Sequence, residues 1–221
     1  RARRPPEGHA THVDGGAGEV SDIIDSLYGR FPVVIAVVVI VTYVSLLLLF
    51  RSLLLPLKAV ILNVLSVLAS YGALVFVFQQ GHFSGVLDFQ SLAEIEATTP
   101  FLLFAVLFGL SMDYEIFLLS RVAESWDRTR DNRRAVAEGL QKSGLIITGA
   151  AAILIVVAAS FVAADIVIVK AIGLGLAFAV FVDVTVVRVL IAPALMRLAG
   201  DWNWWLPGWL RRVLPEVRYA A

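Results

Sequence analysis

The chain has 221 residues, of which 59% are hydrophobic, a proportion typical of integral membrane proteins rather than soluble domains. Its 18 basic and 18 acidic side chains balance, so no net positive field favours nucleic acid as a partner. The absence of cysteine excludes disulfides, thiolate metal sites and thiol catalysis.

Residues 1–30 are polar and rich in Gly, Pro and charge, and we expect them to form an extracytoplasmic tail. They contain no apolar core like that of a signal peptide, and the chain does not start with Met, so we interpret it as part of a longer polypeptide. His9 and His12 are three residues apart, but no third imidazole follows at ligand spacing. Because metal sites need three or four convergent ligands, we predict no metal and no cofactor.

Five apolar stretches follow, each close to the roughly 20 residues that a membrane-spanning helix needs. They predict an all-α membrane protein with a five-helix transmembrane bundle over residues 31–200. The expected spans are residues 33–50, 56–78, 100–120, 145–164 and 166–196. Only a short turn around Asp165 joins the last two spans, so we expect these helices to be antiparallel neighbours.

Basic residues gather in alternate connections. Arg51 and Lys58 follow the first span, whereas residues 79–99 contain no Lys or Arg. The remaining basic connections hold Arg121, Arg128, Arg130, Arg133, Arg134 and Lys142 after the third span, and Arg197, Arg211, Arg212 and Arg218 after the fifth. Because short basic loops stay in the cytoplasm, we predict an extracytoplasmic N-terminus and a cytoplasmic C-terminus.

Two cytoplasmic segments are expected at the membrane surface. Within the amphipathic segment 122–142, residues 131–142 mix charged with apolar side chains, and Val136 and Leu140 share one helix face, which suits a helix lying on the surface. Residues 201–221 form a tail that contains four of the five tryptophans. Since Trp favours the headgroup level, we interpret this tail as an interfacial anchor, with a site for an aromatic ligand as the alternative.

The most informative stretch is Phe108–Arg121, where Asp113 lies well inside the apolar run that starts after Pro100. A carboxylate at the centre of a spanning helix costs about 2.5–3.5 kcal/mol and is functional by default. The cost falls if the carboxyl group keeps its proton. A group that is neutral in one conformation and ionised in another can therefore couple proton binding to a conformational change. We therefore predict that Asp113, with Tyr114 beside it, is a proton relay.

Further polar residues are expected near the depth of Asp113. Counted inward from the cytoplasmic ends at 1.5 Å per residue, they fall within about one helical turn of one plane. This predicted polar layer comprises Asp113, Tyr114, Asp183, Asn63, Tyr43 and Thr148. We interpret Asn63 and Thr148 mainly as interhelical hydrogen bonders, close to the small residues 149–152 that allow helices to approach.

Asp183 has two interpretations that the sequence leaves open. It is either a second relay group or a structural acid, with Arg188 extending toward the cytoplasmic surface. Their spacing of five residues predicts different helix faces and no direct pairing. Glu115 is expected to pair with an arginine of a loop, and Phe117 to pack on the face of Asp113.

Phe108–Arg121 resembles the fourth spanning helix of the C-terminal half of MMPL-type transporters, which belong to the RND (resistance-nodulation-division) superfamily. Two further stretches resemble the same family, and the resemblance covers about residues 15–210. They are Phe50-Arg51-Ser52-Leu53 with Pro56-Leu57-Lys58-Ala59 and Asn63, and Asp183-Val184-Thr185-Val186-Val187-Arg188 with Pro193-Ala194-Leu195-Met196 and Asn203-Trp204-Trp205-Leu206-Pro207.

The resemblance implies a multi-pass antiporter of the bacterial cytoplasmic membrane that exports lipids, drugs or other hydrophobic compounds at the expense of the proton gradient. It implies two six-helix halves, each with a porter domain. Residues 1–30 would end one porter domain, and the N-terminal half would be a partner outside this sequence. It also implies that Asp113 and Tyr114 form the proton relay. The other expected partners are protons, membrane lipids, the hydrophobic substrate and further copies in an oligomer.

Two alternatives come from other classes. An intramembrane aspartyl protease uses two acids in neighbouring helices, as Asp113 and Asp183 would provide, but Asp183 lacks the immediately preceding Gly-x-Gly of that family. A non-transporting scaffold or sensor of the same fold is the other. The chain has no phosphate-binding Gly-Lys-Ser/Thr loop, so ATP hydrolysis is not expected, and we predict that the protein is not an enzyme.

Overall fold

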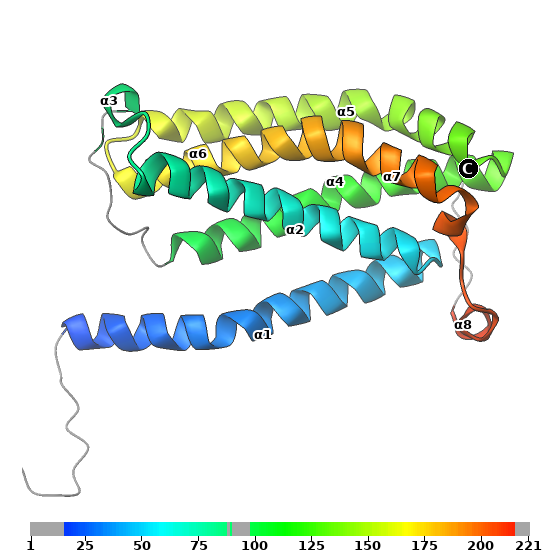
Figure 1. The fold of residues 1–221 in the computed structure, drawn as a ribbon, viewed down its shortest axis with the longest axis horizontal. Coiled ribbons are helices and arrows are strands. Elements are labelled where there is room, and N and C mark those ends of the chain that lie inside the picture. Colours follow the sequence, from blue (N-terminus) through cyan, green and yellow to red (C-terminus); the bar gives the residue numbers. More distant parts are fainter. Residues whose placement is uncertain (1–15, 88, 90–97, 215–221) are drawn as a thin grey trace, which may run out of the picture. The chain divides into compact units, whose positions relative to one another are not determined.

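The computed structural model describes residues 16–87, 89 and 98–214, and these residues contain helices and no strands (Figure 1). The α-helices are α1 (Gly16–Phe50), α2 (Leu54–Leu74), α3 (Ser84–Leu87), α4 (Thr99–Thr129), α5 (Asn132–Ser160), α6 (Val167–Val182), α7 (Ala192–Ala199) and α8 (Gly208–Val213). Two π-helices, η1 (Val75–Gln79) and η3 (Asp183–Ile191), and two 3₁₀-helices, η2 (Phe161–Ala163) and η4 (Gly200–Trp204), extend them. The chain divides into two compact units, residues 1–37 and 38–221, and the packing below lies within the second.

Five helical stretches in the described part of the chain are long and apolar enough to cross a membrane. They are Ser26–Phe50, Leu54–Gln79, Thr99–Thr129, Asn132–Ala163 and Val167–Trp204. This confirms the predicted all-α membrane protein with a five-helix bundle. Residues 16–30, expected as part of a tail, are helical and continue into the first span. His9 and His12 lie outside the described residues.

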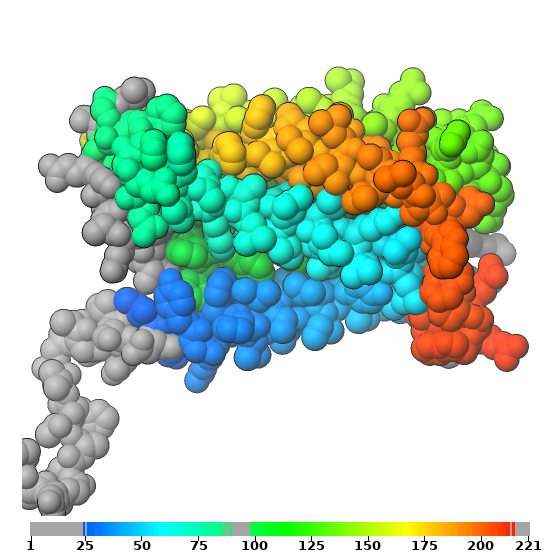
Figure 2. Space-filling model, in the orientation of Figure 1, coloured from blue at the N-terminus to red at the C-terminus, as the bar shows by residue number. Residues whose placement is uncertain are grey.

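The fifth span forms the centre of the second unit. Helix α6 packs against α2, α4 and α5, and α4 and α5 are antiparallel neighbours. Figure 2 shows the segment around α6 and α7, in orange, lying along α2, in cyan. The polar side chains of α2, α4 and η3 can therefore meet inside the bundle.

Residues 122–142, the predicted cytoplasmic amphipathic segment, form a helical hairpin. They are the end of α4, a tight turn and the beginning of α5. Helix α4 ends where Arg130 adopts a left-handed conformation, with φ of 53°, and Asp131 caps α5 by accepting the backbone N–H groups of Arg133 and Arg134. The apolar face that suggested membrane contact is buried in the protein, as Val136 shows.

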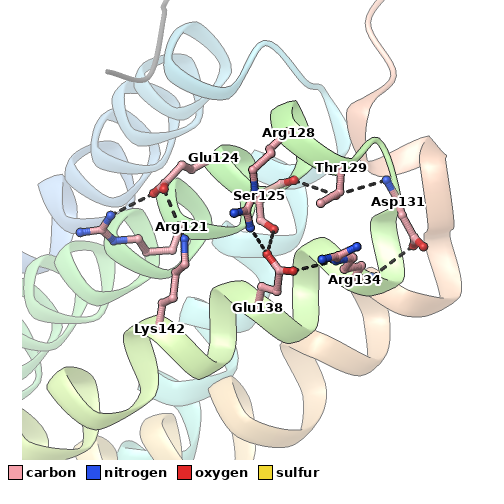
Figure 3. Close-up of polar contacts among 9 residues, drawn as sticks. All are labelled: Arg121, Glu124, Ser125, Arg128, Thr129, Asp131, Arg134, Glu138 and Lys142. Carbon is pink, nitrogen blue, oxygen red and sulfur yellow. Dashed lines mark hydrogen bonds and ion pairs between the residues drawn. The ribbon is translucent and has the colours of Figure 1, made fainter. Parts of the chain in front are cut away.

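Charged side chains join the two helices of this hairpin (Figure 3). Glu138 on α5 accepts hydrogen bonds from Ser125 at 2.7 Å and Arg134 at 2.7 Å and also pairs with Arg128, while Glu124 on α4 pairs with Arg121 at 2.9 Å and Lys142 at 3.3 Å. Exposed ion pairs contribute little to stability one by one. Their effect here is to tie the ends of α4 and α5 together.

Close helix contacts occur at glycines other than those expected. A Cβ atom on Gly139 would lie 2.4 Å from Val122 Cγ2 and 2.9 Å from the Val122 backbone, so α4 and α5 meet there almost without side chains between them. Gly173 lets α6 approach the end of α5 in the same way, because a Cβ atom on Gly173 would lie 2.6 Å from the carbonyl oxygen of Ala158. Gly149, in the small-residue stretch expected to make such a contact, has open space around it.

We predict that Gly139→Ala lowers the melting temperature of the complete protein in detergent. The added methyl group would collide with backbone atoms, and overpacking of this kind costs about 1–3 kcal/mol. Gly144→Ala, on the same helix but with no atom within 4 Å of the new Cβ, is the matched control. It should be neutral or stabilising, because Ala favours a helix over Gly. Equal melting temperatures for the two variants would contradict the close contact.

Candidate functional site

Arg188 is a charged side chain buried in the middle of the bundle, with 2% of its surface exposed. Its Nε donates to Asp183 Oδ2 at 2.7 Å, and its Nη1 donates to Glu115 Oε2 at 3.3 Å. Its Nη2 donates to the Ser111 Oγ at 3.0 Å and to the Ser111 carbonyl oxygen. The Arg188 guanidinium is thus held by groups from η3 and α4 at once.

The local backbone explains how Arg188 reaches Asp183. Both belong to the π-helix η3, in which hydrogen bonds run from residue i to i+5, as between the Ala192 N–H and the Val187 carbonyl. Residues five apart then lie on one face. The prediction that Asp183 and Arg188 occupy different faces was therefore wrong, and Arg188 does not extend to the surface. The prediction used the period of an α-helix, whereas residues 183–191 form a π-helix.

Asp183 is also held from two other helices. Its Oδ1 accepts hydrogen bonds from Ser66 on α2 at 2.9 Å and from Ser111 on α4 at 3.1 Å, while its Oδ2 accepts from Arg188. All of these side chains are buried. We call Ser66, Ser111, Glu115, Asp183 and Arg188 the buried charge cluster. It contains one guanidinium and two carboxyl groups, so uptake of one proton would make it neutral.

A small cavity of about 10 Å³ adjoins the buried charge cluster. Ser66, Ser111, Tyr114 and Asp183 contribute its polar lining. This volume is close to what one water molecule needs, and several polar partners surround it. The site therefore has room for a single water beside the Asp183 carboxylate.

Asp113 and Tyr114 lie on different sides of α4. Asp113 is on the exposed face of this chain, whereas Tyr114 is half-buried. The Tyr114 ring lies beside the buried charge cluster, with its centroid 5.5 Å from Cζ of Arg188. Tyr114 thus follows the exposed Asp113 in the sequence and lies beside the buried Arg188 in space.

The remaining members of the predicted polar layer do not join the buried charge cluster. Asn63 is buried and donates from Nδ2 to the Phe108 carbonyl at 3.2 Å, while its Oδ1 has no hydrogen-bond partner among the described residues. The Thr148 hydroxyl is exposed and donates to the Gly144 carbonyl within its own helix. The Tyr43 hydroxyl donates to the Leu53 carbonyl, and Phe117 packs under the guanidinium of Arg121.

Sequence reasoning missed every member of the buried charge cluster except Asp183. Ser66 and Ser111 carried no signal of their own, although both flank residues already assigned to the polar layer. Glu115 was expected to pair with a loop arginine, but its partner is the intramembrane Arg188. A charged residue inside each of two apolar spans, here Glu115 and Arg188, was the signal that could have linked them.

Comparison with known proteins gives the family. The sequence model of the MMPL family matches residues 1–219. The heme uptake protein MmpL11 of Mycobacterium tuberculosis is 43% identical over 221 residues, which are 99% of this chain and 23% of that protein. The mycolic acid-containing lipids exporter MmpL11 of Mycolicibacterium smegmatis is 44% identical over 94% of this chain and 22% of its own length.

The trehalose monomycolate exporter MmpL3 of Mycolicibacterium smegmatis is 38% identical over 98% of this chain and 21% of that protein. The chain therefore spans between a fifth and a quarter of the length of these relatives.

We predict that Arg188→Met strongly destabilises the complete protein, because it leaves two buried carboxyl groups without their cation. Removing one partner of a buried ion pair lowers the free energy of unfolding by about 3–5 kcal/mol. The measurement is the melting temperature in detergent, which should fall. The triple variant Glu115→Gln, Asp183→Asn, Arg188→Met should recover much of the loss, since it leaves no buried charge uncompensated. Arg121→Met, which removes an exposed arginine from the same bundle, should have little effect.

Proposed function

Because the chain belongs to the MMPL family, we propose that it is part of a transporter that exports lipids or other hydrophobic compounds across the bacterial cytoplasmic membrane, driven by the proton gradient. Two of the similar proteins are named as exporters of mycolic acid-containing lipids and of trehalose monomycolate. The chain covers less than a quarter of each, so we assign the activity to the complete protein. The observation that carries the proton-coupling proposal is the buried charge cluster beside Tyr114.

The proposed orientation has the N-terminus outside and the C-terminus in the cytoplasm. It is supported by hydrogen bonds that gather the basic connections at one end of the bundle. Arg51 donates to the Arg211 carbonyl at 2.9 Å, and Asn203 donates to Asn132, which begins the helix after the basic turn of the hairpin, at 3.2 Å. Short basic connections remain on the cytoplasmic side during insertion.

We assign the first step of proton transfer to Asp113. Its exposed face of α4 is the surface that we propose the other half of the transporter covers, because a carboxylate facing lipid would be costly. Protonation from the outer side removes the charge of Asp113, and release toward the cytoplasm restores it. Tyr114, which can donate and accept hydrogen bonds, positions water or the opposing acid.

Tyr114 would also link Asp113 to the rest of the bundle. It is adjacent to Asp113 in the chain, and its ring lies beside the guanidinium that holds Asp183 and Glu115. A shift of Tyr114 on protonation would disturb contacts that join α2, α4 and η3. Moving one proton through the membrane potential supplies about 2.3 kcal/mol per 100 mV, enough to bias two conformations of similar energy.

The protease alternative lacks the geometry that its chemistry needs. An acid dyad requires two carboxyl groups at hydrogen-bond distance that share a proton. Here the Asp183 carboxylate is held by Arg188, Ser66 and Ser111, and Asp113 is on the exposed face of α4. The placement of the two acids supports a transporter in preference to a protease.

We predict that Asp113→Asn abolishes export by the complete protein without lowering its amount in the membrane. Asn resembles Asp in size but cannot carry a proton through a cycle. The measurement is substrate export from cells, together with substrate-dependent proton uptake in proteoliposomes loaded with a pH-sensitive dye. Tyr114→Phe should reduce both, though less if water replaces the hydroxyl group.

Glu124→Gln is the matched control, because it neutralises a partly exposed acid on the same helix nearer the basic end. It should leave export and proton uptake close to those of the wild type. Undiminished export by Asp113→Asn would remove Asp113 from the relay. Absence of any flux in the folded wild type would instead support the non-transporting scaffold.

A further inference from the structure

Glu115 is a buried acid on α4 that has no part in the proton transfer proposed for Asp113. It has 7% of its surface exposed, so this chain already covers it almost completely. In the buried charge cluster, Glu115 and Asp183 share one cation, the guanidinium of Arg188. The two carboxyl groups have different surroundings, and this difference indicates which of them carries a charge.

The surroundings of Asp183 favour its ionised form. Its Oδ2 accepts a hydrogen bond from Arg188 Nε at 2.7 Å. Its Oδ1 accepts from the hydroxyl groups of Ser66 at 2.9 Å and Ser111 at 3.1 Å. Hydrogen bonds donated to a carboxylate stabilise its charged form, and a short bond from a guanidinium is among the strongest. Asp183 is therefore the anion that compensates Arg188.

Glu115 has far less support for a negative charge. Its single hydrogen bond within the described part of the chain comes from Arg188 Nη1 to Oε2, at 3.3 Å. That distance is longer than the roughly 2.7–2.9 Å typical of a guanidinium–carboxylate hydrogen bond. Burying an ionised carboxylate without good donors is so costly that the group is neutralised instead. The surroundings of Glu115 therefore favour a carboxylic acid.

Neighbouring helices supply no further charge for Glu115. Helices α2, α5 and α6 pack against α4, and the central part of each has no titratable side chain. These stretches are residues 59–70, 143–160 and 171–182. On α4 itself, Asp113 is on the exposed face and Tyr114 lies beside Arg188. If Glu115 were ionised as well as Asp183, one buried guanidinium would have to compensate both carboxylates.

We propose that Glu115 holds a proton in this conformation, whereas Asp183 is ionised and compensates Arg188. The buried charge cluster is then neutral, with one cation, one anion and one carboxylic acid. If Arg188 changed partners from Asp183 to Glu115, the proton would move from Glu115 to Asp183 and the net charge would stay at zero. Glu115 and Asp183 would thus exchange one proton between α4 and η3. This inference deepens the proposed function, on which it rests only for the use of that proton in transport.

The test is infrared spectroscopy of the complete protein at neutral pH, in a detergent without ester groups. A protonated carboxyl group has a C=O stretching band at a higher frequency than carboxylate and amide groups, and this band shifts in D₂O. We expect Glu115→Gln to lose one such band. Glu124→Gln makes the same change on the same helix, at an acid that Arg121 and Lys142 hold ionised, and it should leave these bands unchanged.

Asp183→Asn tests the exchange of the proton. It removes the anion of Arg188 and leaves Glu115 in place, so Glu115 should ionise and the band that Glu115→Gln removes should disappear here too. A carboxyl group with a purely structural role would keep its proton in this variant. Melting temperatures verify that each variant folds. If Asp183→Asn does not fold, the comparison of Glu115→Gln with Glu124→Gln still decides whether Glu115 is protonated.

An unchanged band in folded Glu115→Gln would mean that Glu115 is ionised, and it would overturn the proposal. A band that persists in folded Asp183→Asn would overturn the exchange between the two acids. The spectra do not depend on transport, so the outcome can be separated from that of the export measurements. Absence of flux in the wild type would overturn the proposed function and leave the band of Glu115 in place.

Discussion

A guanidinium group buried between membrane-spanning helices is stable only if acidic and other hydrogen-bond acceptors surround it, and Arg188 imposes this condition on the bundle. Its partners are Asp183 on its own span and Ser111 and Glu115 on α4, while Ser66 on α2 supports Asp183. Apolar packing alone would allow helices to slide or rotate, because lipid is as apolar as the helix surfaces. Directional hydrogen bonds from three helices instead specify one arrangement.

The π-helix η3 makes this arrangement possible. Because its hydrogen bonds run from residue i to i+5, it places Asp183 and Arg188 on one face, where the Arg188 Nε donates to Asp183 Oδ2. Such π-helical segments occur frequently at functional sites.

The bundle thus has two polar regions with different characters. The buried charge cluster has two carboxyl groups for one guanidinium group, and it adjoins a small cavity. The basic end is held by Asn203 and by the exposed ion pairs of the α4–α5 hairpin.

An all-α membrane protein with five spans could be predicted from the amino-acid sequence, because the bilayer imposes a minimum length on apolar runs and few charged residues interrupt them. The sequence also pointed to α4 and to Asp183 as unusual, since charge within such a run is costly. Depth along a helix could be counted, but rotation about its axis could not. Only the tertiary structure therefore decided that Asp183 is buried and Asp113 exposed, that Thr148 and Tyr43 lie apart from the cluster, and that a π-helix brings Arg188 to Asp183.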